Sequence, residues 1–165
     1  MSLLALEAAR SEHPLDVVER LAARADLVFD RIDDELSLAR PGRFADYHLS
    51  FTWLEEVEAL HVSCAFDLKV PPLRRAAILE LIALVNEQLW VGHFDLWATE
   101  NVVMYRHALV LAGGAEPSAA QCDSLMDCAV EACERYFQAF QFTLWAGKTA
   151  REALEGAMFE TRGEA

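Results

Sequence analysis

The sequence predicts an α+β fold, in which helices pack on a twisted antiparallel sheet of about five to six strands. The first observation is an alternation of apolar and polar side chains over residues 47–53 and 60–68, and again on both sides of a turn near 98–101. This alternation is typical of antiparallel strands with one buried face. The second observation is that short turns, with few helical segments between them, join the strand-like runs. That order excludes a doubly wound parallel sheet.

The composition limits the size and the partners of the molecule. The chain has 165 residues, of which 54% are hydrophobic, enough to build a core. We expect one domain over residues 14–160, with a frayed segment at 1–13 before it and a tail at 161–165 after it. The 14 Lys and Arg side chains against 27 Asp and Glu give a net charge of −13. This charge disfavours binding to nucleic acid or to an anionic membrane surface.

The N-terminus and the cysteines indicate a cytoplasmic protein. No basic segment precedes the first apolar residues, as a secretory signal would require, and no apolar run reaches the ~20 residues of a membrane span. The cysteines lack the paired spacing of a zinc site, so we expect reduced, buried thiols and no cofactor. They are Cys64, Cys122, Cys128 and Cys133.

A helix and two short strands are expected first. Pro14 begins a helix whose apolar residues recur at three- and four-residue steps. Residues 28–32 and 36–38 alternate as strands around a turn at 33–34. Residues 40–43 then place Pro and Gly at the second and third positions of a type II turn.

The next two strands, residues 47–53 and 60–68, show the clearest alternation. If the tip of their hairpin is at residues 55–56, Phe51 lies opposite Leu60 and all apolar partners fall on one face. Glu-Glu is a poor two-residue turn, so a longer loop with the same facing remains open.

The second half combines helices with one more hairpin. A helix with a wide apolar stripe is expected from the prolines at 71–72 to near Trp90. Residues 92–97 and 102–111 then form a hairpin. Capping-box patterns at 118–121 and 149–152 begin a long helix that ends near Gly147 and a short helix through Met158.

The second hairpin contains the main candidate site. With Trp97 opposite Val102, His93 lies opposite Arg106, and Asp95 lies diagonal to Arg106. Arg106 and Asp95 would form an ion pair that orders the hairpin or belongs to a dimer contact. The other interpretation is an anion- or peptide-binding patch that includes Trp97.

Two further histidines are weak candidates for metal binding. On the predicted register His48 and His61 are diagonal neighbours, with Cα atoms about 7–8 Å apart. Zinc needs three or four converging ligands, so a solvated polar face is the alternative interpretation. The sequence has no nucleophile elbow, phosphate-binding loop or zinc-protease motif, and we expect no enzymatic activity.

Several segments agree in order with a known family. They are residues 46–51 (DYHLSF), 64–71 (CAFDLKVP), 86–97 (NEQLWVGHFDLW), 105–109 (YRHAL) and 140–142 (FQF). In these segments the chain resembles the YbjN family of bacterial sensory-transduction regulators. The resemblance implies a fold similar to that of type III secretion chaperones, usually dimeric, and it supplies no catalytic residues.

These observations favour a non-enzymatic, cytoplasmic, homodimeric binding module. The resemblance implies a sensory-transduction or stress regulator with a chaperone-like surface for a protein partner that the sequence does not identify. One alternative is a small-molecule or metal-binding sensor or enzyme that uses the sheet face around His93, Asp95 and Arg106. Another is a structural subunit of a larger assembly.

Overall fold

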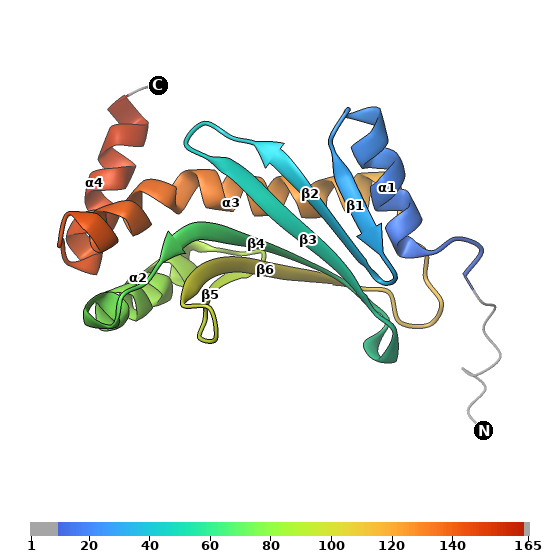
Figure 1. Cartoon of the computed structure of the whole chain (residues 1–165), viewed down its shortest axis with the longest axis horizontal. Coiled ribbons are helices and arrows are strands. Elements are labelled where there is room, and N and C mark those ends of the chain that lie inside the picture. The colour runs from blue at the N-terminus through green and yellow to red at the C-terminus, as the bar shows by residue number, and fades with distance from the viewer. Residues whose placement is uncertain (1–9, 164–165) are drawn as a thin grey trace.

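The structure is a computed structural model that describes residues 10–163, so most of the predicted frayed segment and part of the predicted tail lie outside the described residues. Six antiparallel strands form one sheet in the order β1-β2-β3-β4-β6-β5. Helices α1, α2 and α3 pack on one face of this sheet, with α3 running along it, and α4 packs against α2 and α3 (Figure 1). The elements are α1 (Pro14–Arg24), β1 (Phe29–Ile32), β2 (Glu35–Pro41), β3 (Asp46–Leu54), β4 (Ala59–Lys69), α2 (Arg75–Gln88), β5 (His93–Trp97), β6 (Val102–Val110), α3 (Ala119–Trp145) and α4 (Ala150–Gly163). The predicted α+β class and antiparallel sheet are confirmed.

The register between β3 and β4 differs from the predicted one by two residues. Phe51 lies opposite Val62, and Trp53 lies opposite Leu60. A 3₁₀ turn at Glu55–Val57, followed by Glu58 in the left-handed conformation, replaces the two-residue tip. Because the shift is an even number of residues, the same side chains still face the core.

Two other local predictions are wrong. Pro41 is the last residue of β2 and pairs with Asp46, and Gly42 does not have the positive φ that the third position of a type II turn requires. The prolines at 71–72 lead into a 3₁₀ turn, Pro72–Arg74, and α2 begins only at Arg75. Leu73, an apolar residue at the start of the predicted buried helix, is therefore almost fully exposed.

The second hairpin has the predicted register. His93 lies opposite Arg106, Phe94 opposite Tyr105, and Trp97 opposite Val102. Alternation selected the face, since the pairing buries Phe94 and Tyr105 together on the helix-covered side, and the short loop between Trp97 and Val102 selected the register.

Helix α3 forms the centre of the core. Its capping box is present: the Ser118 hydroxyl accepts the Gln121 N–H, and the Gln121 side chain accepts the Ser118 N–H. Phe137 and Phe140 of α3 pack against Phe66 of β4, with ring centroids 5.4 and 5.3 Å apart respectively. The second capping box, at Thr149, begins α4, which extends beyond the predicted end through residues 161–163 of the predicted tail.

Candidate functional site

The sheet has one face covered by helices and one face without helices, and the second is the candidate site. Side chains alternate between buried and accessible along β3 and β5, so each strand contributes every second residue to the uncovered face. We call this surface the open face. Ser37, Ser50, Ser63 and Arg106 lie opposite one another on four adjacent strands and form a row across it. Asp30 and His93 continue this row on the two edge strands.

Arg106 has the most side-chain partners within this row. Its Nε–H donates to Nε2 of His61 at 3.2 Å, and its Nη1 lies 3.5 Å from Oδ2 of Asp95. His61 is on β4 and Asp95 is on β5, the two strands that flank β6. The guanidinium is therefore held across three strands while both members of the ion pair remain partly exposed. The predicted pairing of Arg106 with Asp95 is present.

The environment of His61 favours its neutral imidazole. Burial lowers the pKa of His61 below its ordinary value of 6.5, and the positive charge of Arg106 lowers it further. The neutral ring with its proton on Nδ1 is the form whose Nε2 accepts from Arg106. His61 thus acts as a positioning acceptor for Arg106.

Trp97 is the last residue of the edge strand β5 and the last of the predicted site residues. It alternates onto the open face with His93 and Asp95, and 47% of its surface is exposed. Trp97 lies opposite Val102, four residues along the hairpin from the pair of His93 and Arg106. Trp and Arg are residue types that are enriched in protein interfaces. His93 itself is exposed and lies opposite Arg106.

The other two predicted histidines do not come together. His48 lies opposite Ala65, and His61 lies opposite Thr52, four residues further along β3. Four residues of strand correspond to about 13 Å, which is too far for a shared ligand. Among the described residues no three His, Cys, Asp or Glu side chains are grouped as a metal site. The diagonal pairing is wrong because the longer loop shifted the register.

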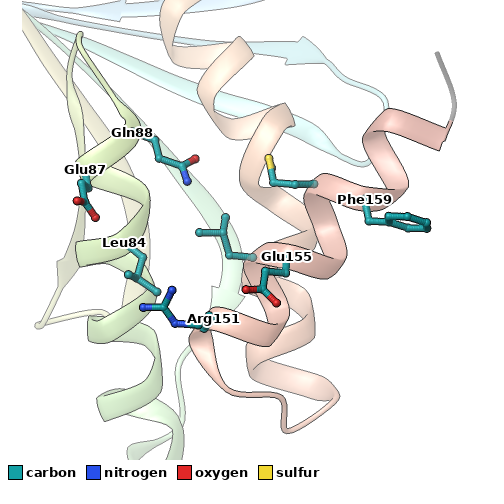
Figure 2. A pocket seen from close by; sticks show the side chains of 8 residues that line it. Leu84, Glu87, Gln88, Arg151, Glu155 and Phe159 are labelled. Atoms are coloured by element: carbon teal, nitrogen blue, oxygen red, sulfur yellow. The ribbon is translucent and has the colours of Figure 1, made fainter.

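A hollow lies between α2 and α4, away from the open face (Figure 2). It has a volume of about 630 Å³ and is lined by Glu87 of α2 and by Arg151 and Glu155 of α4, among others. Figure 2 shows Arg151 reaching toward α2, whereas Phe159 points away from it. None of the predicted site residues lines this hollow.

The sequence prediction missed the serine row. Its members lie on three strands whose registers were partly unknown, and the only signal was a small outward-facing residue near the middle of each strand. Trp90, which the sequence offers with Trp97 and Trp145 as a candidate for an interface, is 99% exposed just before β5. Its position after the last apolar residue of a helix gave no indication of which way it would point.

The fold has a counterpart of known structure. The crystal structure of YbjN from E. coli, described as "a putative transcription regulator", is similar in fold, with a TM-score of 0.54 and 11% sequence identity. The likeness covers 88% of this chain and 93% of that one. No curated protein matches the sequence. None of the helices within residues 10–163 has the length and hydropathy of a membrane-spanning segment.

A family model also matches most of the structured chain. It is the YbjN model, described as "Putative bacterial sensory transduction regulator", and it matches residues 14–142. This range includes α1, the whole sheet and most of α3. By this match the chain belongs to the YbjN family.

Proposed function

We propose that the chain is a non-enzymatic, cytoplasmic protein-binding module, which regulates a partner protein through a chaperone-like contact on the open face. The observation that supports this most directly is Arg106, fixed between His61 and Asp95 on a sheet face that no helix covers. A preorganised guanidinium loses little side-chain entropy when a partner binds. Trp97, four residues beyond His93 along β5 on the same face, supplies apolar contact area.

The chemistry of the open face suits binding more than catalysis. Its central side chains are the small hydroxyls of Ser37, Ser50 and Ser63. A serine nucleophile is activated by an adjacent base such as histidine, because a carboxylate is too weak a base to take the proton of a hydroxyl. In the part of the chain that the structure describes, Ser50 donates to Glu35, and no serine on this face is bonded to a histidine.

The charge of the chain favours a protein over nucleic acid as its binding partner. The net charge of −13 opposes an approach to phosphates, which need a clustered basic surface. The E. coli protein of similar fold is described as "a putative transcription regulator". For this chain we propose that any such regulation acts through another protein and not through direct contact with DNA.

Site-directed photocrosslinking tests the proposal. A photoreactive residue at position 63 should capture a protein partner in the native cell, and Arg106→Ala and Trp97→Ala should each reduce the yield of that product. A photoreactive residue at Asp123, exposed on α3, is the matched control. Equal capture from position 123, or a yield from position 63 that neither substitution changes, would contradict the proposal.

The alternative is a small-molecule sensor on the same face. The half-exposed Arg106 with His93 opposite it supports this alternative, because the two could hold an anion together. NMR titration with inorganic phosphate distinguishes the two functions. Saturable shifts of Arg106 and His93 that Arg106→Ala abolishes would favour the sensor. For a metal-binding version, stoichiometric metal in the purified protein would be required.

A further inference from the structure

The cleft between α2 and α4 lies outside the region that the family model matches. That match ends at residue 142, and α4 begins only at Ala150. The cleft has a volume of about 630 Å³, and small-molecule sites typically occupy about 300–1,000 Å³. None of the residues of the open face lines it, so its chemistry is separate from the partner contact proposed there.

Hydrogen bonds hold both walls of this cleft in place. The Arg74 side chain, just before α2, donates to the carbonyls of Thr143 and Lys148, each at 2.9 Å. These bonds tie the segment that leads into α4 to the beginning of α2. At the other end of α2, Tyr136 Oη donates to Oε1 of Gln88 at 3.0 Å, and Gln88 points toward α4 (Figure 2). The cleft is therefore a preformed part of the fold.

Three charged side chains line the cleft without pairing with one another. Arg151 is in the first turn of α4 and reaches toward α2, and Glu155 follows it one turn later (Figure 2). Glu87 is in the last turn of α2. Among the described side chains, none of these three has an ion-pair or hydrogen-bond partner. Each can therefore bind a group of opposite charge on a ligand.

The two ends of the cleft differ in charge. In Figure 2, Arg151 lies at the end marked by Leu84, and Glu87 and Gln88 lie at the other end. The first turn of α4 adds the positive end of its helix dipole to the charge of Arg151, and the last turn of α2 adds the negative end of its dipole to the charge of Glu87. A carboxylate is therefore favoured at the first end and an ammonium group at the second.

The surface between these charges is apolar. Leu84, Leu154 and Met158 line it, and Leu154 is buried. Phe159 points away from the cleft (Figure 2). The apolar lining therefore stays within the cleft and does not continue as a surface on which a second helix could pack. This shape favours a small ligand with an apolar side chain over a protein segment.

We propose that this cleft binds a zwitterion with an apolar side chain, which is a free α-amino acid or a short peptide. Arg151 holds the ligand carboxylate, because its planar guanidinium can donate two parallel hydrogen bonds to it. Glu87 and Glu155 hold the ligand ammonium group, and the apolar side chain covers Leu84 and Leu154. This small-molecule site goes beyond the protein-binding function of the open face and does not depend on it.

NMR titration with L-leucine and with L-leucyl-L-leucine tests the site and distinguishes an amino acid from a peptide as the ligand. We expect saturable shifts, at millimolar concentrations, of the amides of residues 84–88 and 151–158. The compound that binds more tightly identifies the source of the zwitterion. N-acetyl-L-leucine lacks the ammonium group and L-leucinamide lacks the carboxylate, so each should bind about tenfold more weakly than L-leucine.

Substitutions assign each charge to its part of the ligand. Arg151→Ala should weaken the binding of L-leucine about tenfold and should not weaken that of L-leucinamide, which has no carboxylate. Glu87→Gln combined with Glu155→Gln should weaken the binding of L-leucine and not that of N-acetyl-L-leucine. Arg75→Ala is the matched control, because Arg75 is an exposed arginine of α2 that does not line the cleft.

The substituted side chains are all exposed, so each variant should keep its fold, which circular dichroism checks. The absence of saturable shifts with both L-leucine and L-leucyl-L-leucine would overturn the proposal. Binding of L-leucine that Arg151→Ala leaves unchanged would also overturn it, as would equal binding of L-leucine and its two blocked forms. Photocrosslinking at position 63 in the Arg151→Ala variant reports separately on the partner-binding function.

Discussion

At the scale of single residues, the contact between Arg106 and His61 couples the open face to pH. The hydrogen bond needs a neutral His61, and its pKa is lowered from 6.5 by burial and by the charge of Arg106. The unfolded chain has neither influence. Between the folded pKa and 6.5 the unfolded state therefore binds more protons than the folded state, so stability rises with pH in that window.

We predict that His61→Gln reduces the pH dependence of stability. In the natural chain the free energy of unfolding should decrease as the pH falls from neutral through 6.5 toward the folded pKa of His61. Gln cannot be protonated, so the variant should lose less stability over the same range. The pH dependence that remains in the variant includes the contribution of His107, whose pKa is also lowered. Urea denaturation at several pH values measures this. Identical slopes for the two proteins would show that His61 titrates normally.

Gly92 is expected to tolerate no side chain. Its φ is +70°, and a Cβ would lie 2.1 Å from the Tyr105 hydroxyl oxygen. Gly147 has a similar φ of +63° but no atom within 4 Å of a Cβ. Gly147→Ala should therefore cost about 1 kcal/mol from backbone strain alone. Gly92→Ala should cost about 1–3 kcal/mol more, because Tyr105 must also move. Equal losses in urea denaturation would contradict the proposed close packing of Tyr105 on this turn.

The candidate residues show how far alternation predicts a site. Arg106 and Asp95 were paired correctly because their hairpin has a short loop and bulky partners, Phe94 and Tyr105, on the covered face. His48 and His61 were not paired correctly, because a register shift of two residues keeps every apolar side chain on the buried face. Burial thus selects the face of a strand, and only the loop selects between registers that differ by two.

At the scale of elements, helix α2 is attached to the edge strand β5 by one side chain. The side-chain oxygen Oδ1 of Asn86 accepts the Phe94 N–H at 2.7 Å, and the side-chain Nδ2 of Asn86 donates to the Phe94 carbonyl at 3.0 Å. The Asn86 side chain therefore makes the two hydrogen bonds to Phe94 that a neighbouring strand would otherwise make. Phe94 is almost fully buried, so these backbone groups have little access to water.

Removing this attachment should be costly. We predict that Asn86→Ala lowers the free energy of unfolding by about 1–3 kcal/mol, because two backbone groups lose their partners. Asn86→Asp keeps the acceptor for the Phe94 N–H and places an oxygen against the Phe94 carbonyl, so it should not restore stability. Hydrogen exchange provides a local readout, in which the Phe94 amide should lose protection in the alanine variant. Unchanged protection would show that the strand is held by other contacts.

The elements were predicted best where a local signal defines their start. The capping boxes at Ser118 and Thr149 fixed the beginnings of α3 and α4 to the residue, because the box is made of neighbouring side chains. The beginning of α2 has no side-chain cap, and the prolines before it permit either a 3₁₀ turn or an α-helix. Leu73 was therefore assigned to the wrong side of the boundary.

At the scale of the whole molecule, the sheet order could not be read from the sequence. The hairpins predict that β3 pairs with β4 and that β5 pairs with β6, yet nothing local states that β6, and not β5, lies beside β4. The alternation does fix which side of each strand is buried. It does not fix that the helices that pack on the sheet all lie on one side, which is what leaves the open face accessible.

The net charge acts on the whole fold and leads to the last prediction. With 27 acidic side chains against 14 Lys and Arg, bringing the chain into a compact volume increases its self-repulsion. Raising the ionic strength from about 0.01 M to about 0.1 M shortens the screening length from about 30 Å to about 10 Å. Salt also screens favourable pairs such as Arg20 with Glu12 and Arg106 with Asp95, but surface pairs of this kind contribute little. The free energy of unfolding in urea, an uncharged denaturant, should therefore increase with salt, and a decrease would show that local ion pairs outweigh the repulsion.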